Sequence, residues 1–81
     1  MSVKILYFAS LRESIGHGSE RIGLPPGDVT VGVLRDELGQ HHAALLTVKN
    51  LRAAVNQKMV DMEAPVVDGD EVAFFPPVTG G

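Results

Sequence analysis

Polar and apolar residues alternate at the start of the chain, as in a strand with one buried face. Residues 3–9 are also rich in β-branched and aromatic side chains, which predicts a first strand. The side chains expected to face the core are Val3, Ile5 and Tyr7. Lys4 marks the other face as the solvent side, and Leu6 and Phe8 share that face.

A short helix and a weaker strand are predicted next. Ser10 and Glu13 have the spacing of a capping box, in which each side chain accepts a hydrogen bond from the other residue's backbone N–H. Gly16 is a suitable end for this helix. A second strand is predicted at residues 20–24, and the Pro-Pro-Gly-Asp sequence at 25–28 predicts a turn.

The main helix is predicted to begin after Thr30, a suitable N-cap, and to end at Gly39. Its apolar stripe consists of Val31, Leu34 and Leu38. A further helical turn or two is expected at residues 43–48.

Three strands are predicted in the rest of the chain. Residues 51–56 alternate, and a tight connection at Gln57-Lys58 leads into a short strand at residues 59–60. The Asp-Gly-Asp sequence at 68–70 is a strong turn signal before the last strand, residues 71–75.

This order of elements, β-β-α-β-β-β with minor helical turns, predicts an α+β fold. We expect a mixed sheet packed on one main helix, which is the arrangement of the ubiquitin-like β-grasp. The predicted domain covers residues 1–75, and residues 76–81 are expected to form an extended C-terminal tail.

Composition and charge narrow the function. The chain has 81 residues, no cysteine and a net charge of −3, which suits one small domain without disulfides or thiolate metal sites. Its basic residues are scattered from Lys4 to Lys58, so we expect no nucleic-acid partner. The sequence has no signal-peptide pattern and no apolar run near the ~20 residues of a membrane span. A cytoplasmic protein without membrane contact is expected.

The side chains offer no recognisable catalytic or metal-binding motif. The sequence has neither a phosphate-binding loop nor a G-x-S-x-G turn. His41 and His42 are adjacent and cannot share the i, i+4 helix face of a zinc pair. We interpret them, with His17, as solvated loop residues and expect no metal site. The acidic residues at 68–71 fit a charged turn and lack the later ligands of a calcium loop.

The tail is the strongest candidate for chemistry. Pro76 and Pro77 cannot continue a sheet interior and hold the chain extended. Gly80 and Gly81 have no side chains, so they can enter a channel too narrow for a Cβ. A frayed terminus is the alternative. The carboxylate of Gly81 is ionised at neutral pH and must be activated to react, for example as an acyl adenylate made by a partner enzyme.

Strand parity predicts a docking surface beside the tail. Glu71 marks the solvent side of the last strand, and Phe75 shares that face. If the first and last strands are neighbours, Phe8 and Phe75 form an exposed apolar patch, a feature typical of interaction sites. Met59 is expected to join it. The alternative is that helices cover both faces and these residues belong to the core.

Three blocks of the sequence carry a resemblance to a known family. They are DGDEVAFFPPVTGG at 68–81, YFASLRE at 7–13 and AVNQ at 54–57. The chain resembles the MoaD/ThiS family of ubiquitin-like sulfur carriers. Its FFPPV segment favours the MoaD branch, the small subunits of molybdopterin synthase, over the shorter ThiS-type carriers of thiamine thiazole synthesis. The segment at 39–50 matches nothing that we can assign.

The resemblance implies a β-grasp fold and a sulfur-carrier role. A MoeB-like enzyme would adenylate Gly81 with ATP used in trans, so no cofactor is expected on the chain itself. The resulting thiocarboxylate would enter a MoaE-like large subunit in a heterotetramer and donate sulfur to cyclic pyranopterin monophosphate, which forms molybdopterin. The chain would thus be catalytic only as part of the complex. A ubiquitin-like protein modifier and a passive interaction module remain alternatives.

The resemblance also implies roles for individual residues. Gly80 and Gly81 match the reactive tail motif of the family. The residues expected to contact partners are Phe8, Met59, Phe75, Pro76, Pro77, Val78 and Thr79.

Overall fold

The structure is a computed structural model that describes residues 1–77. Five strands form one mixed sheet in the order β2-β1-β5-β3-β4. The strands are β1 (Ser2–Tyr7), β2 (Ser19–Gly23), β3 (Arg52–Val55), β4 (Lys58–Val60) and β5 (Glu71–Phe75). The helices are α1 (Ala9–Ile15), α2 (Val31–Gly39) and α3 (Ala44–Thr47). The predicted α+β class with a mixed sheet is therefore confirmed.

The first and last strands lie side by side in the centre of the sheet. β1 and β5 are parallel, with Lys4 beside Glu71 and Tyr7 beside Phe74. β2 pairs with the outer side of β1, and β3 pairs with the outer side of β5, both antiparallel. This central parallel pair, flanked by antiparallel strands, is the β-grasp arrangement that the order of elements predicts.

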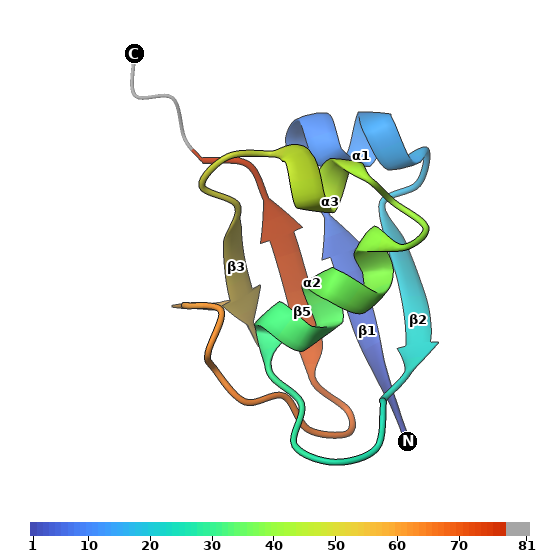
Figure 1. The fold of residues 1–81 in the computed structure, drawn as a ribbon, viewed down its shortest axis with the longest axis vertical. Helices are drawn as coiled ribbons and strands as arrows, with labels where there is room; N and C mark the ends of the chain where they lie inside the picture. The colour runs from blue at the N-terminus through green and yellow to red at the C-terminus, as the bar shows by residue number, and fades with distance from the viewer. Residues whose placement is uncertain (78–81) are drawn as a thin grey trace.

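The helices cover one face of the sheet. α2 and α3 lie across that face, and α1 lies at the end where β1 finishes (Figure 1). The inward side chains of β1 are buried, as the alternation predicts, and pack with the apolar stripe of α2. These core residues include Val3, Ile5, Tyr7, Val31, Leu34, Leu38, Val72 and Phe74. Within residues 1–77, none of the helices has the length and apolar character to cross a membrane.

The main helix begins as predicted, but its end has a different physical basis. The backbone N–H of Val33 donates to Oγ1 of Thr30 at 3.2 Å, so Thr30 is the N-cap. Gly39 is the last helical residue and is not in a left-handed conformation. A Cβ at Gly39 would lie 2.5 Å from Cγ of Leu46. This glycine therefore lets the α3 segment pack closely against the end of α2.

The predicted capping box at the first helix is wrong. α1 begins at Ala9, and Phe8 is in the N-cap position without a side-chain cap. The backbone N–H of Phe8 donates to the carbonyl of Phe74 at 3.2 Å, so contact with β5 continues to the residue where the helix begins. Ser10 consequently lies within the first turn, past the capping position. The predicted end at Gly16, which has φ of 97°, is confirmed.

The tight connection between β3 and β4 lies one residue earlier than predicted. Its central residues are Asn56 and Gln57, with φ values of 50° and 70°, and Lys58 already belongs to β4. Two successive positive φ values are what a two-residue hairpin of type I′ requires. Asn56 also binds the start of β5: its Oδ1 accepts from the Glu71 N–H at 3.0 Å, and its Nδ2 donates to Oδ1 of Asp70 at 2.9 Å.

Candidate functional site

The face of the sheet opposite the helices carries a row of apolar side chains. The strand register places Leu6 beside Ala73, Ala73 beside Ala54, and Ala54 beside Met59. Four adjacent strands, β1, β5, β3 and β4, thus contribute one residue each. Met59 is 50% exposed and is the register partner of Ala54, so it lies on this face of the sheet; its contact with a partner stays a prediction.

Two aromatic side chains lie on the same face, where β1 and β5 end. Phe8 directly follows β1 and is 48% exposed, and Phe75 at the end of β5 is half-buried. The bond from the Phe8 N–H to the Phe74 carbonyl keeps these two chain segments adjacent. The predicted apolar patch of Phe8 and Phe75 therefore exists, and the alternative that both are core residues is wrong.

Small residues between these larger ones leave a shallow groove. Ala54 and Ala73 form its floor and are only 8% and 9% exposed, because larger side chains flank them. The groove has a volume of about 400 Å³. Its lining residues are Leu6, Phe8, Ala54, Gln57, Glu71, Ala73 and Phe75, and we call it the docking groove. An apolar side chain of a partner would bury its surface here.

The tail leaves the sheet at one end of the docking groove. β5 ends at Phe75, and Pro76 and Pro77 follow as non-strand, half-buried residues. Proline has no N–H to donate to a neighbouring strand, which explains why pairing stops there. The predicted roles of Val78, Thr79, Gly80 and Gly81 concern residues 78–81, which lie outside the described residues.

Ala54 and Gln57 line the docking groove but are not among the residues predicted for the site. In the alternating segment 51–56, Ala53 is 1% exposed and faces the core. Ala54 must then face the opposite side of the sheet, so the alternation in the sequence could have identified it as a residue of that face. The missing information was that β3 is the neighbour of β5, which brings Ala54 beside Ala73.

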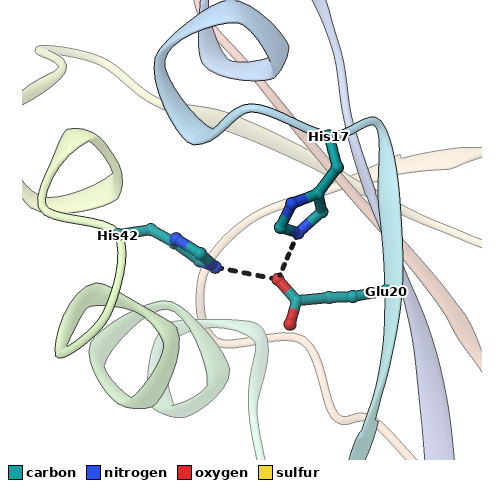
Figure 2. A group of neighbouring side chains, drawn as sticks. All are labelled: His17, Glu20 and His42. Carbon is teal, nitrogen blue, oxygen red and sulfur yellow. Dashed lines mark hydrogen bonds and ion pairs between the residues drawn. The ribbon is translucent and has the colours of Figure 1, made fainter.

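A second cluster of polar residues lies at the edge strand β2, on the helix side of the sheet. Figure 2 shows His17 and His42 pointing toward the carboxylate of Glu20. The Nε2 atoms of His17 and His42 are 3.3 Å and 2.9 Å from Oε2 of Glu20. The hydroxyl of Tyr7 donates to the same oxygen at 2.7 Å.

The interpretation of the histidines as solvated loop residues needs correction. The side chain of His42 is only 17% exposed and contacts Glu20, and that of His17 is 46% exposed and contacts the same carboxylate. The expectation of no metal site considered the adjacent pair, His41 and His42. The structure instead brings together His42 and His17, which come from different loops.

The cluster shifts the ionisation of two of its members. Burial, followed by the hydrogen bond to Glu20 and its charge, raises the pKa of Tyr7 well above its ordinary value of 10.0. For Glu20, burial acts to raise the pKa, but hydrogen bonds from Tyr7, His17 and His42 outweigh burial and lower it below 4.5. Glu20 is therefore an anion at neutral pH.

Comparisons with known proteins agree in family and fold. A family model described as the ThiS family matches residues 5–81. The chain is 43% identical over 82 residues to the molybdopterin synthase sulfur carrier subunit of Escherichia coli (strain K12), covering 98% of this chain and 99% of the relative. The protein of the same name from Haemophilus influenzae is 40% identical over 82 residues, with coverage of 98% and 99%.

Comparison with a solved structure supports the same fold. The crystal structure of SAMP1, the small archaeal modifier protein 1 of Haloferax volcanii, has a TM-score of 0.83 to this chain. Its sequence is 31% identical, and the match covers 100% of both chains. The β-grasp arrangement of the sheet and helices is thus shared with that structure.

Proposed function

This chain belongs to the ThiS family, and on that basis we propose that it is the sulfur carrier subunit of a molybdopterin synthase. The observation that carries the proposal is the docking groove beside the point where the chain leaves β5 toward Gly80 and Gly81. Relatives that are 43% and 40% identical over nearly the whole chain have this function in their names.

The reacting group in this proposal is the carboxylate of Gly81. A MoeB-like enzyme transfers AMP from ATP to this carboxylate and releases pyrophosphate. A sulfur nucleophile supplied by a partner then displaces AMP, which leaves a thiocarboxylate at the end of the chain. The thiocarboxylate is the carried sulfur, so the main chain itself is the covalent carrier. ATP acts only at the activating enzyme, so the chain itself needs no nucleotide site, and a cytoplasmic location is part of the proposal.

The discharge step needs a second partner, a MoaE-like large subunit. Phe8, Phe75 and Met59 provide apolar side chains that the partner would bury. Pro76 and Pro77 restrict the backbone beyond β5, which reduces the entropy lost when the tail enters the partner. There the sulfur passes to cyclic pyranopterin monophosphate, and water replaces it at the acyl carbon of Gly81, which restores the carboxylate. The small subunit supplies the sulfur and the docking surface, and the complex of two small and two large subunits supplies catalysis.

A protein modifier is the second candidate, because the structural likeness extends to the small archaeal modifier protein 1 of Haloferax volcanii. In that case Gly81 would form an isopeptide bond with a lysine of another protein. Both functions use the same tail, so the fold alone does not separate them.

Intact-mass measurement of the protein from its own cells separates these functions. The carrier function predicts a fraction in which one carboxylate oxygen is replaced by sulfur, whereas conjugates to other proteins indicate the modifier. Deletion of Gly81 should abolish molybdopterin formation with the large subunit while circular dichroism and large-subunit binding stay nearly unchanged. Molybdopterin formation by the deleted chain would show the proposal to be wrong.

A further inference from the structure

The cluster at β2 combines three side chains from separate parts of the chain. Glu20 projects from β2, His17 from the loop before it, and His42 from the connection between α2 and α3 (Figure 2). The cluster lies on the helix side of the sheet, opposite the docking groove, since Glu20 is the register partner of the inward-facing Ile5. The proposed sulfur chemistry does not use these residues.

The donor atoms suit a divalent transition metal. Two imidazole nitrogens and one carboxylate oxygen lie within 4.8 Å of one another. Zinc binds such atoms at about 2.0–2.2 Å, which places tetrahedral ligands roughly 3.3 Å apart. The separations from Oε2 of Glu20 to Nε2 of His17 and of His42, 3.3 Å and 2.9 Å, are already close to that spacing.

The surroundings hold the donors in place. The ring of Tyr7 packs edge-on against the rings of His17 and His42, with centroid separations of 6.0 Å and 5.7 Å. The Tyr7 hydroxyl orients Glu20 through its 2.7 Å hydrogen bond, as outer-shell partners do for carboxylate ligands. Glu20 is ionised at neutral pH, which is the state that binds a cation.

The cluster is accessible to solvent. The side chain of His17 is 46% exposed, that of Glu20 is 27% exposed, and that of His42 is 17% exposed. An ion can therefore enter without opening the core, and a water molecule can complete a four-coordinate site. Two histidines, one carboxylate and a water form a known ligand set of zinc.

We propose that His17, Glu20 and His42 bind one zinc-type divalent cation through the two Nε2 atoms and a carboxylate oxygen. The ion replaces the two histidine–glutamate hydrogen bonds with coordinate bonds. It thereby ties the loop before β2 and the α2–α3 connection to the edge of the sheet.

The test uses the full, untagged chain after chelator treatment, titrated with zinc by calorimetry and followed by thermal unfolding. We expect one ion per chain and an increase in Tm of roughly 5–10 °C at saturating zinc. His17→Asn, Glu20→Gln and His42→Asn should each weaken zinc binding by at least about 10-fold. His41→Asn is the matched control, because His41 is exposed on the same connection but lies outside the cluster; it should bind zinc like the wild type.

Three results would overturn the proposal. One is a wild-type Tm that zinc does not change, which would make the cluster a hydrogen-bonded network alone. Another is wild-type zinc affinity in the His17→Asn variant. Because the side chain of His17 is 46% exposed, this variant is expected to fold. The third is equal loss of affinity in the His41→Asn and His42→Asn variants, which would assign binding to the adjacent pair. None of these results bears on the sulfur-carrier function.

Discussion

The hydroxyl of Tyr7 donates to Oε2 of Glu20 at 2.7 Å, so a residue of the central strand supports a carboxylate on the edge strand. Tyr7 is only 1% exposed. Its ring belongs to the core, whereas its hydroxyl reaches the histidine cluster. A substitution at Tyr7 that keeps the ring and removes the hydroxyl therefore tests the polar contacts at β2 without changing the core packing.

Replacing Tyr7 by Phe should keep the ring packing and remove this hydrogen bond. Because the acceptor is an ionised carboxylate, we expect the free energy of unfolding to fall by about 1–2 kcal/mol. Urea unfolding monitored by circular dichroism measures this loss. Tyr7→Phe with wild-type stability would show that Glu20 gains nothing from the hydroxyl.

The stability of the chelator-treated protein should depend on Glu20 at acidic pH. The folded-state pKa of Glu20 is below its ordinary value of 4.5. The ionised carboxylate of Glu20 therefore makes its full contribution to the free energy of unfolding above pH 4.5. This contribution is lost as the pH falls through the folded-state pKa. The groups facing this carboxylate, Tyr7, His17 and His42, are the same in wild type and in Glu20→Gln.

Urea midpoints on both sides of pH 4.5 test this prediction. The wild type should lose stability more steeply than Glu20→Gln as the pH falls below this value. Parallel curves for the two proteins would contradict it.

Phe75→Ala should weaken binding to the large subunit more than it weakens the fold. Loss of an aromatic anchor typically costs at least about 2 kcal/mol of binding, or roughly 30-fold in affinity. Phe75 is only half-buried, so we expect a smaller loss of folding stability, about 1 kcal/mol. Calorimetric titration with the large subunit and urea unfolding give the two values.

Val67→Ala is the matched control, because Val67 is 61% exposed and lies outside the docking groove. Its affinity and stability should both stay near wild type. A large loss of stability with unchanged affinity in Phe75→Ala would instead assign Phe75 to the core.

Gln57→Gly should stabilise the protein. Gln57 has a positive φ of 70° next to Asn56, and Asn-Gly is the favoured pair for this hairpin turn. We expect a gain of about 0.5–1 kcal/mol in the free energy of unfolding. Asn56→Gly tests specificity: it removes hydrogen bonds to Asp70 and Glu71 and should destabilise the protein. Equal effects of the two changes would argue against the φ-based explanation.

The features predicted from the sequence are those that local patterns encode. Alternation in the first strand identifies both the buried face and the face that carries Phe8, because strand parity leaves only two arrangements. The capping hydrogen bond of Thr30 is also local, because its donor, the Val33 N–H, is only three positions away. The patch of Phe8 and Phe75 required only one long-range assumption, the adjacency of the first and last strands, and the structure confirms it.

The missed features depend on contacts between distant segments. Glu20 and His42 are 22 positions apart and meet only because the α2–α3 connection packs beside β2. No helical or strand period links them. The capping box at Ser10 failed for a similar reason, since the contact of Phe8 with β5 determines where the helix begins. Gln57 adopts a conformation that its residue type does not favour, so propensity misplaced the turn.

The central position of β5 has a consequence for how the protein folds. The backbone N–H of Ser2 at the start of β1 donates to Asp68 in the turn before β5. The two residues are 66 positions apart, so joining them closes a loop of nearly the whole chain. Before β5 is inserted, only the pairs β2-β1 and β3-β4 can form, and isolated two-stranded ribbons are marginal in water. Folding is therefore expected to be slow for a chain of this size and all-or-none. A partly folded chain has no complete docking groove, so a partner that recognises the groove engages only finished molecules.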